Sequence, residues 1–158
     1  MLKYIGLAVL FFISVYIGQI ISGTYKTSVK QIEAFIQFIK YIKSQVEYYG
    51  TPYPEIFSKY TNIPLEQCGF IQRLRNGDWN TALDDTVFGF DNNIKEILYN
   101  FGRDLGKKMR DDEINNCDYT IEQLRIHYNT LKSDLPKKNK LCTSLSLMAG
   151  LSMIIILI

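Results

Sequence analysis

Apolar residues concentrate in two uncharged runs at the ends of the chain, and the residues between them follow a helical pattern. Residues 4–21 read YIGLAVLFFISVYIGQII, and residues 141–158 read LCTSLSLMAGLSMIIILI. At 1.5 Å per residue, a helix of this length extends roughly 27 Å, close to the hydrocarbon thickness of a bilayer. The pattern predicts a transmembrane anchor in residues 1–24, a middle domain in residues 25–140 and a second transmembrane helix in residues 141–158.

Each run has one alternative interpretation. A cleaved signal peptide is the alternative for the first, since Lys3 precedes it and the residues ISG at 21–23 are the nearest match to a cleavage site. No small-x-small sequence follows this run cleanly, which favours an uncleaved anchor. A buried core helix is the alternative for the second run, but the sequence PKKNK directly before it favours a membrane helix.

Basic residues beside the two runs predict the orientation. Those on the inner side of the runs are Lys26, Lys30, Lys137, Lys138 and Lys140, whereas Lys3 alone lies on the outer side. Because basic residues next to a membrane span are retained in the cytoplasm, we expect a cytoplasmic middle domain with both termini outside.

Two long amphipathic helices are predicted to frame the middle domain. The first has apolar residues at steps of three and four: Val29, Ile32, Ile36, Ile39, Ile42, Val46 and Tyr49. The last has a heptad seam over three repeats: Ile114, Cys117, Ile121, Leu124, Tyr128, Leu131 and Leu135. A coiled coil between chains would use the same seam, but the matching stripe on the first helix favours antiparallel packing within one chain. Pro136 is expected to kink the chain just past the seam.

Shorter helices are expected between these two. Gly50 ends the first helix, and Thr51 as N-cap with Pro52 in the first turn begins the next. The expected elements that follow are a helix over Leu65–Arg75 ending at Asn76-Gly77, a helix beginning at Asp78 that buries Trp79, Leu83 or Val87, and a helix capped by Asp91. The sequence shows no strand pattern, so the predicted fold class is all-α, a bundle of about six helices between two transmembrane helices.

Few residues suggest catalysis or ligand binding. Cys68, Cys117 and Cys142 are widely spaced without a CxxC motif, so neither a zinc site nor a disulfide framework is predicted. His127 is the only histidine and has no cysteine or carboxylate at metal-ligand spacing. A net charge of +2 without a basic stripe predicts no nucleic-acid partner. Without a phosphate-binding loop, dinucleotide fingerprint or nucleophile motif, the chain is expected to be no enzyme and to use no cofactor or metal.

The sequence FGRDLG at residues 101–106 places two glycines four positions apart in a helical pattern. Each glycine costs a helix about 0.5–1 kcal/mol relative to alanine, so each needs a structural reason. The neighbours Phe101 and Leu105 supply apolar burial that offsets this cost. We expect Gly102 to permit close approach of another helix, and Gly106 to end its own helix in a left-handed conformation.

A family resemblance covers essentially the whole chain. The chain contains, in this order, the start MLKYIG, the segments VEYYGTPYPEIF, NGDWNTAL and FGRDLG, a long amphipathic helix and a short terminal run. This order is similar to that of the stage III sporulation protein AB family of endospore-forming bacteria. The most specific residues of this resemblance are Tyr48, Thr51, Pro52, Phe101, Gly102, Leu105 and Gly106. The resemblance implies a helical domain similar to that of the type II secretion F-type platform proteins.

The resemblance also implies a function. The family acts as a non-enzymatic platform or scaffold in a secretion-like channel complex in the mother-cell membrane around the forespore. The implied partners are a secretion-ATPase-like subunit, small polytopic membrane subunits and membrane lipid. The residues themselves leave two alternatives: a coiled-coil membrane adaptor unrelated to sporulation, and a membrane-bound enzyme of unknown chemistry, against which the single histidine counts.

Two further sets of residues bear on this interpretation. Relatives usually have acidic residues where Lys43 and Gln45 stand and an aspartate where Met109 stands, so a polar network built on those acids is altered in this chain. Small residues four positions apart form a stripe on each terminal run: Gly18 and Ser22 on the first, Ser146 and Gly150 on the second. Such stripes suit helix packing in membranes, although glycine and serine are also common in membrane helices without that role.

Overall fold

The computed structural model describes residue 23 and residues 25–157, with side chains described up to residue 137 and at residues 140, 144 and 148. The anchor predicted over residues 1–24 therefore lies, apart from residue 23, outside the described residues. Every regular element in the described part of the chain is a helix, so the predicted all-α class is confirmed. Within that same part, no helix combines the length and apolar character needed to cross a membrane.

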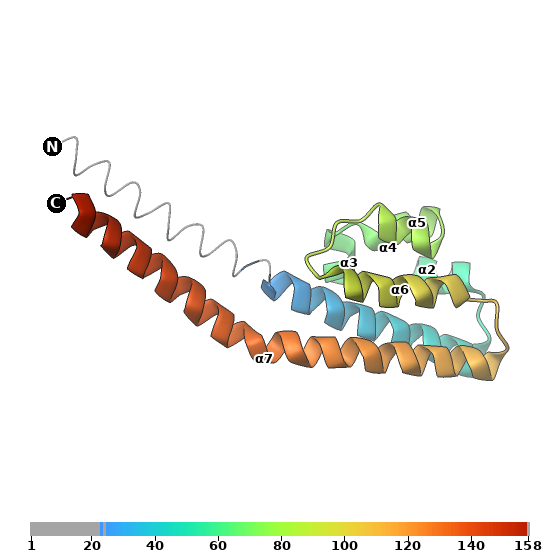
Figure 1. Cartoon of the computed structure of the whole chain (residues 1–158). Helices are drawn as coiled ribbons and strands as arrows, with labels where there is room; N and C mark the ends of the chain where they lie inside the picture. Colours follow the sequence, from blue (N-terminus) through green and yellow to red (C-terminus); the bar gives the residue numbers. More distant parts are fainter. Residues whose placement is uncertain (1–22, 24, 158) are drawn as a thin grey trace. The chain divides into compact units, whose positions relative to one another are not determined.

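The chain divides into two compact units. One comprises Ser28–Thr130, which we call the helical domain, and the other combines Met1–Thr27 with Leu131–Ile158. The helical domain contains the short helices, most of the first long helix and the first part of the last one (Figure 1).

The first long helix covers residues 25–44 and continues without a break into a π-helix, η1 (Gln45–Tyr49). Gly50 ends it in the left-handed conformation, with φ of 59°, as the sequence predicts. A π-helix is rare because it adds one residue to the turn, and such turns often occur near functional sites.

This first helix is the middle layer of the helical domain (Figure 1). The beginning of α7 (Arg110–Leu157) lies on one side of it. The other side is covered by a layer of short helices: α2 (Tyr53–Lys59), α3 (Ile63–Gln67), α4 (Phe70–Asn76), α5 (Trp79–Asp84) and α6 (Asn92–Asp104). The first helix therefore has packing partners on two opposite faces.

Burial along the first helix reflects this position. Ile32, Ile36, Ile39 and Ile42 are buried as predicted, but Ala34, Phe35 and Phe38 are buried as well. Tyr49, which the predicted stripe includes, is instead 74% exposed. Helical periodicity identifies one apolar face, so it misses the second face of a helix that is covered on both sides.

The first helix and α7 run antiparallel. Lys43 pairs with Asp118 at 2.6 Å, whereas Glu33, ten residues earlier, shares a cavity with Asn129, eleven residues later. The predicted pairing of the two amphipathic helices within one chain is confirmed.

The seam of α7 is buried where it belongs to the helical domain. Cys117, Ile121 and Leu124 are buried, and Ile114 and Tyr128 are half-buried. Pro136 does not end the helix, because α7 includes it and continues to Leu157.

An aromatic cluster around Trp79 forms the core between the short helices and the first helix. The Trp79 ring lies 5.2 Å from Phe101, 5.4 Å from Phe70 and 5.7 Å from Phe38, measured between ring centroids. Its indole Nε1 donates a hydrogen bond of 2.8 Å to the Leu98 carbonyl. Trp79 thus ties α5 to α6 and to the first helix.

Three helix boundaries agree with the sequence. Asp78 caps α5 and accepts hydrogen bonds from the backbone amides of Asn80 and Thr81. Asp91 occupies the N-cap position of α6, although its side chain makes no capping hydrogen bond. Asn76 ends α4 immediately before Gly77, as predicted.

Three local predictions are wrong. The helix expected over Leu65–Arg75 is two helices, because Gly69 adopts a left-handed conformation with φ of 81° between α3 and α4. Thr51 is not the N-cap of α2; Pro52 occupies that position, and the Thr51 hydroxyl bonds to Gln45 Oε1 at 3.2 Å. Val87 lies past the end of α5 and is 90% exposed, whereas Trp79 and Leu83 are buried.

Candidate functional site

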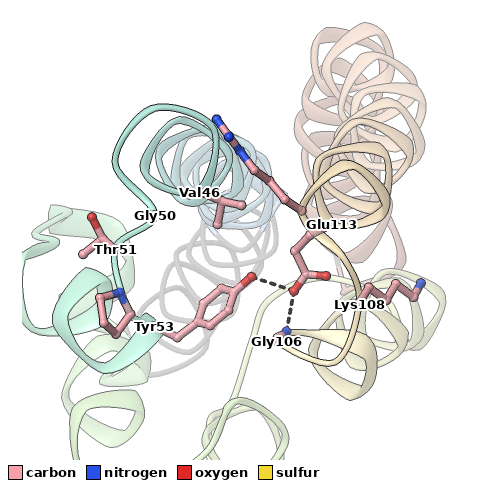
Figure 2. A pocket seen from close by; sticks show the side chains of 9 residues that line it. Val46, Gly50, Thr51, Tyr53, Gly106, Lys108 and Glu113 are labelled. Carbon is pink, nitrogen blue, oxygen red and sulfur yellow. Dashed lines mark hydrogen bonds between the residues drawn. The ribbon is translucent and has the colours of Figure 1, made fainter.

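A cavity of about 340 Å³ opens at the end of the helical domain where η1 ends and α7 begins (Figure 2). It is formed by two segments that are distant in sequence, residues 46–53 and residues 106–113. Its lining residues are Val46, Gly50, Thr51, Pro52, Tyr53, Gly106, Lys108, Arg110 and Glu113.

Glu113, in the first turn of α7, is the central polar group of this cavity. Its side chain is only 3% exposed. The Tyr53 hydroxyl donates a hydrogen bond of 2.6 Å to Glu113 Oε1, and the backbone amide of Gly106 donates to the same oxygen (Figure 2). The second carboxylate oxygen, Oε2, is buried and has no hydrogen-bond partner among the residues that the structure describes.

The partners of Glu113 are held in place by their own environment. Gly106 adopts a φ of 76°, which aligns its amide with the carboxylate in a conformation that other residues rarely adopt. A Cβ at Gly106 would lie 3.2 Å from the Tyr53 ring, so the ring packs directly on the glycine backbone. Burial raises the pKa of Tyr53 well above its ordinary value, and the hydrogen bond to Glu113 raises it further. Tyr53 therefore keeps its proton and donates a hydrogen bond to the carboxylate.

The two basic residues that line the cavity are engaged elsewhere. Lys108 Nζ pairs with Asp104 at 2.8 Å. The Arg110 guanidinium donates a hydrogen bond to the Glu47 carbonyl at the end of the first helix. Neither forms an ion pair with Glu113 in the described part of the chain.

A second, more polar groove of about 560 Å³ runs between the first helix and α7. Its lining residues are Lys40, Lys43, Ser44, Glu47, Asp118, Ile121, Glu122 and Arg125. The hydrogen bond to Asp118 raises the pKa of Lys43. Lys43 thus joins the two long helices through its ion pair with Asp118.

The other two departures from the family pattern lie near the first cavity. Gln45 accepts a hydrogen bond from Thr51 through its side chain. Met109 is 81% exposed and precedes α7. Neither joins a polar network between the first helix and α7 of the kind that acidic residues would form.

The structure separates the residues on which the resemblance rests into three groups. Thr51, Pro52 and Gly106 line the cavity. Phe101 is buried and Leu105 is half-buried, so both belong to the packing of α6. Tyr48 is 73% exposed.

Gly102 has a packing role of its own. A Cβ added to this residue would lie 1.9 Å from Trp79 Cδ1, closer than any real contact, so the indole ring occupies the space that a side chain would need. The expected close approach at Gly102 is confirmed, and so is the left-handed conformation at Gly106, which follows the C-cap Leu105 of α6.

The proposed membrane-packing residues are not placed by the structure. Gly18 and Ser22 lie outside the described residues. Ser146 and Gly150 lie in α7, in the part whose side chains are not described.

Sequence reasoning missed Glu113 and Tyr53. A signal for Glu113 exists: it lies one helical turn before Cys117 and two turns before Thr120 and Ile121, all of them buried. A carboxylate in line with a buried stripe indicates a buried acid. One of its two donors, Tyr53, lies at the start of α2, 60 positions earlier in the chain, and no local pattern could reveal this partner.

Metal binding finds no support around the candidate residues. His127 is half-buried on α7. The described residues contain no group of three or more histidine, cysteine or carboxylate side chains able to hold a metal ion.

The comparison with protein families is decisive for the chain as a whole. The family model of stage III sporulation protein AB matches residues 3–158. The chain belongs to the stage III sporulation protein AB family. A sporulation-related role follows from this membership. No curated protein and no solved structure matches the chain.

Proposed function

We propose that this member of the stage III sporulation protein AB family is a non-enzymatic platform subunit of a secretion-like channel complex between mother cell and forespore. The observation that carries the proposal is the family match over residues 3–158. The match also counts against an adaptor unrelated to sporulation, which the heptad seam alone would permit.

The proposed location is the mother-cell membrane around the forespore, with the helical domain in the cytoplasm and both termini outside. The uncharged runs at residues 4–21 and 141–158 and the lysines beside them support this arrangement. In this proposal the two runs are transmembrane helices that hold the helical domain at the membrane surface.

The interior of the helical domain is held together in a way that suits a scaffold. Its buried groups are joined to one another: Tyr53 and Gly106 both hold Glu113, and Trp79 holds α6. We propose that it serves as a docking platform similar to that of type II secretion F-type proteins. Its partners would be a secretion-ATPase-like subunit and small polytopic membrane subunits.

Affinity purification of the tagged full-length protein from sporulating cells tests this function. We expect the ATPase-like subunit and at least one polytopic subunit to co-purify. Absence of both, at expression matched to a tagged control membrane protein, would contradict the platform function.

A pair of double variants separates partner contact from anchoring. Replacing Ser146 and Gly150 with leucine removes the small-residue stripe, and we expect it to lower recovery of the polytopic subunits. Replacing Met148 and Leu151 with phenylalanine changes other faces of the same helix and should leave recovery unchanged. Equal recovery from both double variants would show that the second run is an anchor only.

A further inference from the structure

The cavity beside Glu113 contains an unbalanced buried charge. The carboxylate is 3% exposed, and both of its hydrogen bonds come from neutral donors and end on the same oxygen, Oε1. Oε2 is buried and has no hydrogen-bond partner among the described residues. A buried carboxylate is destabilising unless it is paired with a cation or fully hydrogen-bonded.

The two basic residues that line the cavity do not supply the missing partner. Lys108 and Arg110 line the same cavity, yet Lys108 pairs with Asp104 and Arg110 bonds to the Glu47 carbonyl. Glu113 is the one acidic residue among those that line the cavity, and both basic ones are engaged with other groups.

The cavity walls suit a long aliphatic chain that ends in a cation. Val46, Pro52 and the ring of Tyr53 provide apolar surface to the cavity that Glu113 also lines. The Tyr53 hydroxyl points toward the Glu113 carboxylate (Figure 2). Lysine and arginine combine an apolar stem with a charged head in this way, and an aromatic ring beside the head adds cation–π attraction. An anion in the same cavity would face the unpaired carboxylate.

The η1 segment gives a second indication that this cavity is a binding site. The π-helix Gln45–Tyr49 includes Val46 and ends at Gly50, which also lines the cavity. A rare, less favourable turn beside a buried and incompletely satisfied acid places two costs at one location. Such a coincidence is typical of a site that a ligand completes.

We propose that this cavity binds a lysine or arginine side chain of a partner protein, with its head group pairing with Glu113 and its stem lying between Val46 and Tyr53. That the side chain belongs to a partner rests on the proposed platform function. Because Oε2 is enclosed, the head group reaches it only when a side chain at the rim moves aside.

Nuclear magnetic resonance on the isotope-labelled full-length protein in detergent tests the chemistry of the cavity. The probes are n-butylammonium, which represents a lysine side chain, and n-butanol, which has the same stem without the charge. We expect saturable shifts of the Gly106 amide and the Val46 methyl resonances with n-butylammonium. Binding of n-butanol should be at least about tenfold weaker, since the charged hydrogen bond is absent.

Three variants connect the binding to Glu113. Glu113→Gln removes the charge and should weaken n-butylammonium binding at least about tenfold. Glu122→Gln makes the same charge change at an exposed site on α7 and should leave binding unchanged. Val46→Phe fills the cavity without changing Glu113 and should also abolish the shifts. This variant keeps the test informative if Glu113→Gln unfolds.

The proposal is overturned if n-butylammonium causes no saturable shift, if n-butanol binds equally well, or if Glu113→Gln and Val46→Phe both bind like the wild type.

A second experiment tests whether the bound side chain belongs to a partner, and it uses the affinity purification from sporulating cells. Glu113→Gln, but not Glu122→Gln, should reduce recovery of one subunit. Amine binding without any co-purified subunit would overturn the platform function and the partner assignment while the cation site stands. Subunits recovered equally with both variants would overturn the partner assignment alone.

Discussion

At the scale of single residues, the two glycines of FGRDLG perform different tasks. Gly102 gives its side-chain space to the Trp79 ring, and Gly106 supplies a left-handed turn that aims its amide at Glu113. The sequence predicts both properties, because a helix accepts glycine only for space or for conformation. It could not predict which partners take advantage of them.

We expect Gly102→Ala to destabilise the protein by about 1–3 kcal/mol or more, since its Cβ would overlap the buried indole and force the core to shift. Urea unfolding followed by the fluorescence of Trp79, the only tryptophan, measures this change. Gly77→Ala is the matched control, because its Cβ would meet only the Arg73 carbonyl at an ordinary 3.5 Å. Equal midpoints for the two variants would contradict the packing role of Gly102.

Tyr53→Phe should destabilise the protein by about 1–3 kcal/mol, because it leaves the buried Glu113 with a single donor. Tyr48→Phe removes the same hydroxyl from an exposed ring and should change stability by less than about 0.5 kcal/mol. The same unfolding measurement compares the two variants. A cost for Tyr48→Phe as large as that for Tyr53→Phe would show that the hydrogen bond to Glu113 contributes nothing specific.

At the scale of elements, the sequence predicts correctly those features that depend on residues within one element, and it misses those that depend on contacts between elements. Long helices with a regular stripe were predictable, since a buried face of α7 such as Cys117, Ile121 and Leu124 repeats within one element. The break at Gly69 is not predictable in this way, because its φ of 81° depends on how α3 and α4 each pack. The second buried face of the first helix, with Phe35 and Phe38, also depends on elements far along the chain.

The seam of α7 gives stability a dependence on alkaline pH. Burial, with nearby Glu113 and Asp118, raises the pKa of Cys117 from its ordinary 9.0 to about 12. Above pH 9 the thiol ionises in the unfolded chain but stays protonated in the folded one, so the unfolded state binds fewer protons. The free energy of unfolding should therefore fall as pH rises from 9 towards 12.

Cys117→Val should remove this part of the pH dependence, because it replaces the thiol with an apolar side chain that does not ionise. Ile121→Val is the control: it lowers stability at every pH without altering the slope. Urea unfolding at pH 8, 9 and 10 gives the slope for each protein. A slope in Cys117→Val equal to that of the wild type would contradict the role of the buried thiol.

At the scale of the whole molecule, the predicted membrane arrangement is testable by thiol labelling in intact vegetative cells that express the protein in the cell membrane, where a reagent added from outside reaches one face of that membrane. With the three native cysteines replaced, we expect a single cysteine at Asn76 to be protected from a membrane-impermeant reagent and to react after the membrane is permeabilised. Asn76 is exposed on the helical domain, so its protection cannot come from burial. Labelling from outside would place this domain on the other side of the membrane.

The candidate site is the part of the molecule that the sequence predicts least. Thr51, Pro52 and Gly106 draw attention through the resemblance, but they become neighbours only when the loop after η1 meets the start of α7. Glu113 and Tyr53 carry no motif, and their pairing over 60 positions is a product of the tertiary fold. The fold class and the order of the helices follow from local sequence patterns, whereas the site forms only when distant segments of the folded chain come together.

The central position of the first helix has a consequence for how the protein opens. The layer of short helices and α7 each cover one face of residues 32–42, so loss of either layer leaves those residues packed against the other. Their amide protons should be the slowest in the molecule to exchange with deuterium, because exchange there requires both layers to separate. Amides in α3 and α5, which are packed against another layer on one side only, should exchange sooner. Mass spectrometry of peptides from these segments would show whether the first helix is the last element to unfold.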